Sequence, residues 1–270
     1  MKNYLIPDIL QIDISPYCNL NCNYCDNVNG KKCNKYFIDV DNFKFILNQA
    51  EEIKHVIPQF WGEPLLHPNF EELLFLCKEK EKYVSYYTNG TTLHNFNIKK
   101  ILTYSDEIKI SIESIDEEHY YSIKREPLFN QVKDNIIRLW QENKKMGFPT
   151  NIIIRATNIF ENDKEIEMFR KYWEPFCHKL IIKPLRNLTK DYFLFNIPKG
   201  FYCEKLHKHS IVKFNGDMIT CCSDHFGEIV IGNVFKNNIV ELFNSDSFSH
   251  LRNNLHQNKF CNNCWYLYKI

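Results

Sequence analysis

"DILQIDISPYCNLNCNYC", residues 8–25, joins a strand pattern to three closely spaced cysteines. Side chains 9, 11 and 13 alternate with the apolar side chains 10, 12 and 14, which is the period of a β-strand, and Pro16 ends the run. Cys18, Cys22 and Cys25 then fall on the loop after this strand. The stretch therefore predicts a first strand whose C-terminal end carries a group of thiols.

Five more strand patterns follow, each separated from the one before it by a helical pattern. We expect strands at 55–64, 83–90, 107–114, 150–157 and 179–185, and helices at 39–54, 69–82, 97–102, 129–147 and 163–173. Asp39 is placed to cap the first helix, and Gly147 to end the fourth. Alternating strands and helices favour parallel strands with helical crossovers. We therefore predict an α/β fold, a partial (β/α)6 barrel of parallel strands with its ligand site at the C-terminal strand ends.

The pattern changes after about residue 200. "SIVKFNGDMITCC", residues 210–222, contains two short strand patterns around Asn215-Gly216, a pair that tolerates positive φ and favours a hairpin. A helix is expected over 240–255. We predict two domains, a core over 1–200 and a small hairpin-plus-helix module over 201–270.

Composition narrows the class of protein. The 270 residues carry a formal charge of +1, which suggests neither nucleic acid nor an anionic membrane as a partner. No uninterrupted apolar segment resembles a signal or a membrane span, so we expect a cytoplasmic protein. Eleven cysteines in a reducing compartment favour metal or cluster ligation over disulfides.

The first thiol group has three members, whereas a structural zinc site normally takes four protein ligands. Three thiolates on a 4Fe-4S cluster would leave one iron open to a bidentate small molecule. Cys18-x3-Cys22-x2-Cys25, with Tyr24 before the third cysteine, resembles the signature of the radical S-adenosylmethionine (SAM) enzymes. The resemblance implies a 4Fe-4S cluster on these cysteines, with the amino and carboxylate groups of SAM at the open iron.

Later segments extend the resemblance. "WGEP", residues 61–64, resembles the family's GGEP motif with Trp61 in place of the first glycine, and "TNG", residues 88–90, also recurs in relatives. "SIESIDEEHYYSIKRE", residues 111–126, resembles the fourth-strand segment in which a serine and an arginine help to hold SAM. The SAM-binding residues implied in these motifs are Tyr24, Gly62, Glu63, Pro64, Thr88, Asn89, Ser111 and Arg125.

Arg155 lies inside the apolar strand pattern "NIIIRAT". An inward charge on a strand needs a partner. A carboxylate of SAM or of the substrate would serve, and so would a structural glutamate. We include Arg155 among the candidate cofactor-binding residues.

A second cysteine set lies in the C-terminal module. Cys203, Gly216-x4-Cys221 and Cys261-x2-Cys264 resemble the twitch module, a shortened SPASM extension. Four thiolates can ligate a complete auxiliary 4Fe-4S cluster, and a structural zinc would use the same four residues. Cys222 is an alternative to Cys221.

The resemblance implies a radical SAM oxidoreductase. A 5′-deoxyadenosyl radical would remove hydrogen from a small polar substrate such as a sugar or cyclitol, and proton loss with electron transfer to the auxiliary cluster would complete a two-electron oxidation. A one-electron donor such as flavodoxin or ferredoxin is the expected protein partner. The candidate catalytic residues are Arg186, Asp224 and His225.

Other functions stay open at this point. An epimerase or dehydratase would need a hydrogen-atom donor, for which Cys222, Tyr86 or Tyr87 could serve, or would use the auxiliary cluster structurally. A peptide-modifying maturase is less expected, because only 17 residues precede Cys18 and leave no room for a peptide-binding domain. A noncatalytic iron-sulfur electron carrier is the alternative from another class, but it would not need the "GEP" and "TNG" segments.

Overall fold

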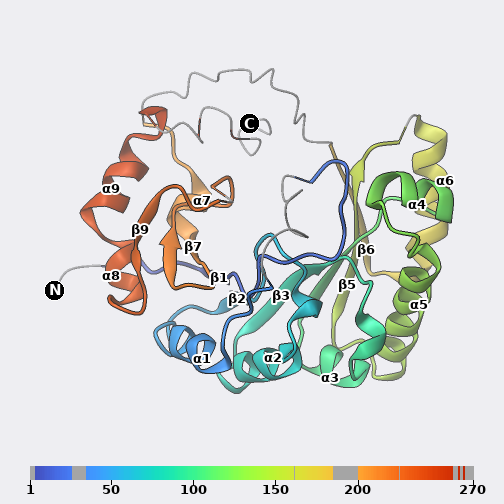
Figure 1. Cartoon of the computed structure of the whole chain (residues 1–270), viewed down its shortest axis with the longest axis horizontal. Coiled ribbons are helices and arrows are strands. Elements are labelled where there is room, and N and C mark those ends of the chain that lie inside the picture. The colour runs from blue at the N-terminus through green and yellow to red at the C-terminus, as the bar shows by residue number, and fades with distance from the viewer. Residues whose placement is uncertain are drawn as a thin grey trace.

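The computed structural model describes residues 4–25, 35–160, 162–184, 200–224, 226–257, 261 and 264. One open, curved sheet runs through the molecule in the strand order β6-β5-β4-β3-β2-β1-β7-β8-β9 (Figure 1). Its strands are β1 (Ile9–Ile12), β2 (His55–Ile57), β3 (Tyr83–Thr88), β4 (Glu107–Ser111), β5 (Asn151–Asn158), β6 (Lys179–Pro184), β7 (His209–Val212), β8 (Asp217–Ile219) and β9 (Val230–Asn233). Neighbours from β6 to β7 are parallel, and β8 and β9 are antiparallel. The predicted α/β fold with six parallel strands is confirmed.

Helices cover the outer face of this sheet and its two ends. Figure 1 shows the first three beneath the sheet, α4 and α6 at one end, and α8 and α9 at the other. The helices are α1 (Val40–Asn48), α2 (Phe70–Glu79), α3 (Ile98–Thr103), α4 (Glu117–Lys124), α5 (Phe129–Lys145), α6 (Asp163–Trp173), α7 (Glu204–Lys208), α8 (Ile239–Phe243) and α9 (Asp246–Asn253). Within the described residues, none of these helices is long and apolar enough to cross a membrane.

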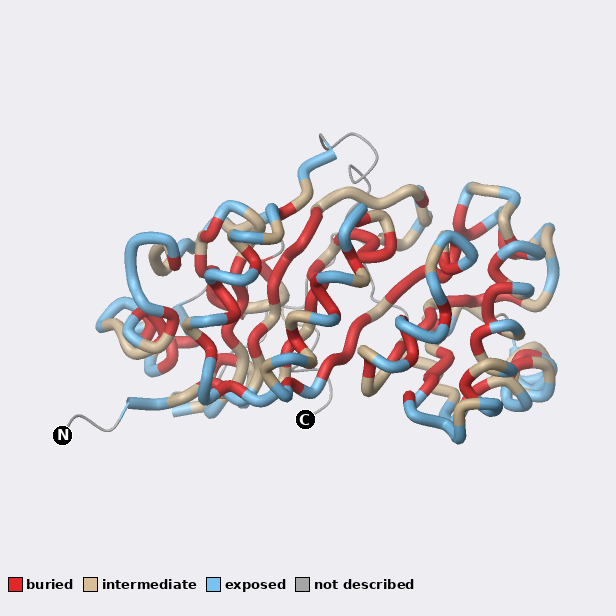
Figure 2. Tube along the Cα trace, turned by 90° about the horizontal axis from the view of Figure 1, so that it is seen from below, coloured by how far each residue is buried: buried red, intermediate tan, exposed pale blue. Residues whose placement is uncertain are grey.

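The two faces of the sheet differ in polarity. Ile108 and Ile110 are fully buried in the main core, and Figure 2 shows such buried positions running along the strands. The alternate side chains of β4 and β5 point to the other face. There Lys109, Ser111 and Arg155 are half-buried. We call this the inner face, and its polar character separates it from the apolar side that packs against the helices.

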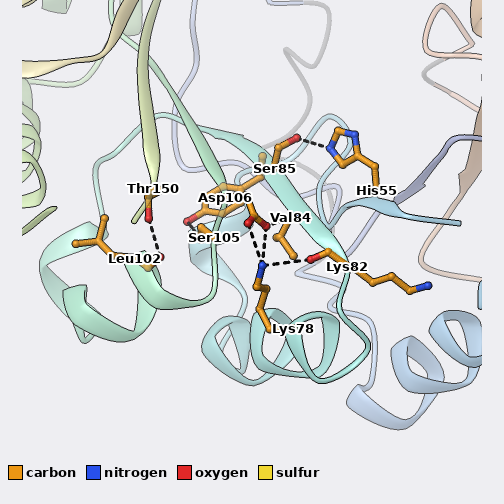
Figure 3. A network of polar contacts seen from close by, with 10 residues as sticks. His55, Lys78, Lys82, Val84, Ser85, Leu102, Ser105, Asp106 and Thr150 are labelled. Atoms are coloured by element: carbon orange, nitrogen blue, oxygen red, sulfur yellow. Dashed lines mark hydrogen bonds and ion pairs between the residues drawn. The ribbon is translucent and has the colours of Figure 1, made fainter. Parts of the chain in front are cut away.

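The N-terminal ends of the strands are tied together by polar contacts (Figure 3). Lys78 of α2 pairs with Asp106 at 2.8 Å, and Asp106 also accepts a hydrogen bond from the backbone N–H of Val84 at 2.7 Å. His55 and Ser85 join β2 and β3 through a contact of 2.8 Å between Nε2 and Oγ. This end of the sheet is thereby fixed, which leaves the opposite strand ends to carry the loops of interest.

Some local features differ from the expectations. The helix predicted over 240–255 is two helices, because the Ser245 side chain accepts a hydrogen bond from the backbone of Phe248 and starts a new helix. Helix α4 and strand β9 were not predicted, and β2 ends at Ile57 instead of 64. Asp39 does occupy the N-cap position of α1, but its side chain makes no capping hydrogen bond.

The C-terminal segment joins the sheet through β7, which pairs with β1. The predicted hairpin is present as β7 and β8, with Gly216 at φ 83° in the turn. Next to this ladder, Asp13 is 1% exposed and pairs with Lys213 at 3.1 Å, and the Lys213 ammonium lies 5.2 Å from the centre of the Phe60 ring. Strand β1 therefore lies between the core and the hairpin and bonds to both.

Candidate functional site

Three loops meet at the C-terminal ends of β1, β2 and β3. The "GEP" loop is tied to the cysteine loop by a hydrogen bond from the Glu63 backbone N–H to the Tyr17 carbonyl, at 2.9 Å. The "TNG" loop is tied to it by the Asn89 side-chain amide, which donates to the side-chain oxygen Oδ1 of Asn19 at 2.9 Å. These contacts bring the three predicted motifs into one site.

Gly62 lies where the first two loops approach most closely. A Cβ atom at this position would lie 2.0 Å from the Ser15 carbonyl oxygen and 2.7 Å from that of Tyr17. Both obstacles are backbone atoms, which cannot turn aside as a flexible side chain can. Glycine is therefore required here by the space between the loops, and Pro64 continues the segment as a buried first residue of a 3₁₀ turn over Pro64–Leu66.

Glu63 is 3% exposed and its carboxylate is held by donors on both oxygens. Oε1 accepts from the Thr88 hydroxyl at 2.6 Å and from the Leu65 N–H at 3.1 Å, and Oε2 accepts from the Asn89 N–H at 2.6 Å. Burial raises the pKa of Glu63 to about 7, against the lowering effect of these hydrogen bonds. Such a carboxylate is fixed in position, and a further donor such as an amino group would stabilise its ionised form.

SAM affinity should rise with pH through the range in which Glu63 ionises. The pKa of Glu63 lies near 7, above its usual value of 4.5, so the carboxyl is largely protonated at pH 6 and ionised at pH 8. If only the ionised form accepts a hydrogen bond from the SAM amino group, affinity at pH 6 should be about tenfold lower than at pH 8. Equilibrium dialysis of the reconstituted protein at both pH values measures this ratio.

Two variants make the measurement specific to Glu63. Glu63→Gln should bind SAM weakly at both pH values and lose most of the ratio, because its amide does not titrate. Glu79→Gln, a change at an exposed residue of α2, should behave like the wild type and serves as the control. A full pH ratio retained in Glu63→Gln would show that another group is responsible.

The three thiols of the cysteine loop lie in this site, each half-buried. The Asn89 side-chain amide approaches the Cys18 sulfur at 3.9 Å. The pKa of Cys18 is raised to about 12, mainly by burial and also by the charges of Glu63, Cys22 and Cys25. Thiolates that oppose one another in this way need a cationic centre to be deprotonated, so the donor chemistry fits an iron-sulfur cluster.

Tyr24 lies in the same loop and makes a contact that the sequence did not indicate. Its hydroxyl accepts a hydrogen bond from the Lys124 ammonium at 2.8 Å, and Lys124 in turn pairs with Glu113 at 2.5 Å. The predicted cation of this segment, Arg125, is exposed and adopts φ 62° directly after α4. The sequence offered only their positions as a signal: Lys124 is next to Arg125, and Glu113 is two residues after Ser111, the two residues that the family motif selects.

Ser111 and Arg155 lie side by side on the inner face, paired in register between β4 and β5. The Arg155 guanidinium lies 5.0 Å from the centre of the Tyr87 ring, and the Lys109 ammonium lies at the same distance from that ring. The structural glutamate considered for Arg155 is not seen among the described residues, since Glu113 pairs with Lys124 instead. Arg155 therefore presents hydrogen-bond donors beside the inner face.

The second cysteine set also comes together, around α7, the end of β8 and the C-terminal Cys-x2-Cys. Burial raises the pKa of Cys261 to about 12, with further contributions from the charges of Cys264 and Cys203. Burial likewise raises the pKa of Cys221, and the charges of Cys222 and Cys261 raise it by smaller amounts. These mutual effects place the four predicted thiols in one neighbourhood.

Cys222 has different surroundings from Cys221. It packs with Trp61 against a small apolar cluster of Phe60, Ile211 and Ile219. Cys221 packs against the main core, so both thiols have apolar neighbours. The charge of Cys261 acts on the Cys221 thiol, and this supports Cys221 as the ligand. Among the described residues, no three His, Cys, Asp or Glu side chains are placed to hold a single metal ion. Both ligand sets stay predictions, supported by their donor chemistry and grouping.

The three candidate catalytic residues fare differently. Asp224 is fully buried, and its two oxygens accept hydrogen bonds from the backbone N–H groups of Glu228 at 2.7 Å and Ile229 at 2.9 Å. This arrangement favours a structural role for Asp224, which is to hold the turn after the hairpin. Arg186 and His225 lie outside the described residues, so their roles stay predictions.

Comparisons with known proteins identify two family matches. A family model described as the radical SAM superfamily matches residues 12–172, and one described as the SPASM iron-sulfur cluster-binding domain matches residues 203–265. A "GTP 3',8-cyclase" of Chlorobaculum tepidum is 27% identical over 167 residues, which cover 61% of this chain and 51% of the relative. This chain spans about half the length of the curated relatives it matches.

Two solved structures share the fold. SuiB from Streptococcus suis, bound to S-adenosylmethionine, aligns with a TM-score of 0.70 and 17% identity, covering 92% of this chain and 68% of SuiB. BtrN in complex with AdoMet and 2-DOIA aligns with a TM-score of 0.62 and 18% identity, covering 96% of this chain and 92% of BtrN. At this level of identity the likeness extends to the fold alone.

Proposed function

We propose that this chain, which belongs to the radical SAM superfamily and carries a SPASM iron-sulfur cluster-binding domain, oxidises a small polar substrate. The two domains bring the predicted cofactors: a 4Fe-4S cluster with SAM, and an auxiliary iron-sulfur cluster. The observation that carries the proposal is the meeting of the three thiols with the buried Glu63 carboxylate at the ends of β1–β3.

The residues of this site have distinct tasks in the proposal. Cys18, Cys22 and Cys25 would hold the first cluster, and Cys203, Cys221, Cys261 and Cys264 the auxiliary one. With SAM and one electron from a reductant, the first cluster would supply a 5′-deoxyadenosyl radical, and the auxiliary cluster would supply an acceptor for one electron. Glu63, fixed by Thr88 and Asn89, would accept a hydrogen bond from the SAM amino group. Gly62 keeps the two loops close enough for that contact.

The inner face supports a small polar substrate. Ser111 and Arg155 offer hydrogen-bond donors on adjacent strands, and Lys109, which pairs with Glu107, contacts the same Tyr87 ring as Arg155. The hydroxyl groups of a sugar or cyclitol can accept hydrogen bonds from such side chains. Tyr87 also lies on this face, whereas Tyr86 is fully buried on the helix side and contacts Phe70, so of the two tyrosines only Tyr87 remains a candidate donor for the epimerase alternative, beside Cys222.

Action on a purine nucleotide is a second candidate. It is favoured by the relatives named GTP 3',8-cyclase. Cationic side chains on the inner face would suit phosphate groups as well as they suit hydroxyl groups. The two candidates differ in substrate and in product, so one assay separates them.

Anaerobic incubation of the reconstituted protein with SAM and a chemical reductant tests the proposal. We expect 5′-deoxyadenosine to appear, and to increase with an amino sugar or aminocyclitol that is converted to a product two hydrogens lighter. Mass spectrometry of parallel reactions with a panel of such compounds and with GTP measures both outcomes. Consumption of GTP with no oxidised sugar or cyclitol would favour the second candidate, and absence of 5′-deoxyadenosine in every reaction would contradict both.

A further inference from the structure

A buried ion pair lies directly behind the cysteine loop. Lys124, the last residue of α4, and Glu113, just beyond β4, approach to 2.5 Å, and each side chain is 2% exposed. Removing two charges from water is costly, and a buried ion pair often adds little to stability compared with apolar side chains of the same size. The pair therefore calls for an explanation beyond stability of the fold.

The pair connects four parts of the molecule. The Lys124 ammonium donates to the Tyr24 hydroxyl at 2.8 Å and lies 5.3 Å from the centre of that ring, in the turn between Cys22 and Cys25. The second oxygen of Glu113 accepts a hydrogen bond from the backbone N–H of Thr157 in β5 at 3.3 Å. Through these contacts the rigid strands β4 and β5 fix the position of a loop side chain.

The backbone of the cysteine loop binds the end of the same helix. The Asn23 N–H donates to the Ile123 carbonyl at 3.0 Å, and the Asn23 side-chain amide donates to the Ser122 carbonyl at 3.3 Å. The Asn21 N–H donates to the Lys124 carbonyl at 3.4 Å. The last carbonyls of a helix have no partner inside the helix, so the loop satisfies groups that would otherwise bind water.

We propose that Lys124 is a positioning residue for the first cluster: held by Glu113, it fixes Tyr24 and the turn carrying Cys22 and Cys25, and it places a positive charge beside the cluster. The proposal rests on the assignment of Cys18, Cys22 and Cys25 as ligands. It extends the proposed function by naming a group that controls how firmly the cluster is held and how readily it accepts an electron.

Charge and geometry predict separate effects. A cluster gains negative charge on reduction, so a nearby ammonium group stabilises the reduced form and raises the potential. The Lys124 ammonium contacts the cysteine loop directly through Tyr24, whereas the second oxygen of Glu113 faces the backbone of β5, so the positive end of the pair is turned toward the cluster site. Loss of the whole pair should therefore leave the site less positive and more loosely held.

The test uses variants that remain folded. Lys124→Met alone would leave the Glu113 carboxylate buried without a partner and is expected to destabilise the fold, so the main variant is Glu113→Gln with Lys124→Met. We expect its first cluster to lose iron to a chelator about tenfold faster than the wild type, the effect typical of lost outer-shell contacts. We also expect a more negative midpoint potential for that cluster, followed by EPR in a redox titration, with the auxiliary midpoint unchanged.

Three further variants separate position from charge. Tyr24→Phe should speed iron loss but leave the potential close to wild type, because the ammonium group remains. Lys124→Arg keeps the positive charge, so its midpoint potential and its rate of iron loss should lie between those of the wild type and those of the double variant. Lys99→Met, at a lysine whose side chain is 72% exposed, should change neither quantity. Circular dichroism melts of the cluster-free proteins show whether each variant folds.

The two levels of the proposal fail in different ways. A folded double variant with the wild-type rate of iron loss and the wild-type midpoint would overturn the role of Lys124. If, in the same experiments, the variant lacking Cys18, Cys22 and Cys25 still lost half of the iron, the proposed function would stand. If that cysteine variant kept all of its iron, the ligand assignment itself would be wrong.

Discussion

Replacing Cys18, Cys22 and Cys25 together with alanine should give a folded protein that has lost one of its two clusters and all SAM cleavage. Two 4Fe-4S clusters contain about eight irons per chain, so the variant should retain about half of that amount after anaerobic reconstitution. The physical reason is the number of donors: without these thiols the site keeps only oxygen and amide groups, which are poor ligands for iron in such clusters. Iron and sulfide analysis, with quantification of 5′-deoxyadenosine, measures the result.

A matched control comes from cysteines outside the site. Cys77→Ala with Cys177→Ala changes two buried thiols, one on α2 and one close to β6, and should leave the iron content and SAM cleavage at the wild-type level. Retention of all iron in the triple variant would mean that the first loop holds no cluster. The "GEP" and "TNG" segments would then need another explanation.

Replacing Cys261 and Cys264 with alanine should abolish formation of the oxidised product while SAM cleavage continues. The two thiol sets lie on different elements, one after β1 and the other around α7, β8 and the C-terminal segment, so loss of one need not dissolve the other. Without the second set, the protein has no ligands for a group that takes the electron of the substrate radical. Product and 5′-deoxyadenosine should be quantified in the same samples.

Two neighbouring cysteines provide an internal comparison for this experiment. Cys221→Ala should lose auxiliary iron, whereas Cys222→Ala should keep it, because Cys221 lies close enough to Cys261 for the two thiols to influence each other. Bound clusters contribute to folding, so a circular dichroism melt must accompany each assay. A folded Cys261/Cys264 variant that makes the oxidised product at the normal rate would exclude the electron-acceptor role and favour a structural metal beside an epimerase or lyase.

Much of the first site could be predicted because its motifs are local in sequence. The cysteine spacing, "GEP" and "TNG" each follow a strand, and parallel strands bring their C-terminal ends to one edge of the sheet. The structure adds how the motifs hold one another: Glu63 accepts hydrogen bonds from both Thr88 and Asn89. The order of the motifs along the chain thus predicts that they lie close together, and the hydrogen bonds show how their side chains are oriented.

Other features depend on contacts that no local pattern records. The segment after β4 contains many charged residues, and the selection of Arg125 followed from a family motif, whereas burial of Lys124 depends on the path of α4 against the cysteine loop. The break between α8 and α9 near Ser245 was not predicted, because the apolar residues on both sides of it share a helical period. In each case tertiary packing decided between side chains or boundaries that are equivalent in sequence.

The position of β1 has a consequence for how the two thiol sets are spaced. One edge of this four-residue strand pairs with β2 and the other with β7, and its end continues into the cysteine loop. The backbone ladder, and not a linker, therefore sets the separation of the cysteine loop from the hairpin that carries Cys221. A chain shortened before β7 would expose β1 as a sheet edge able to pair with other molecules, and would leave the Asp13 carboxylate without Lys213. The core and the C-terminal module thus share one continuous β-sheet.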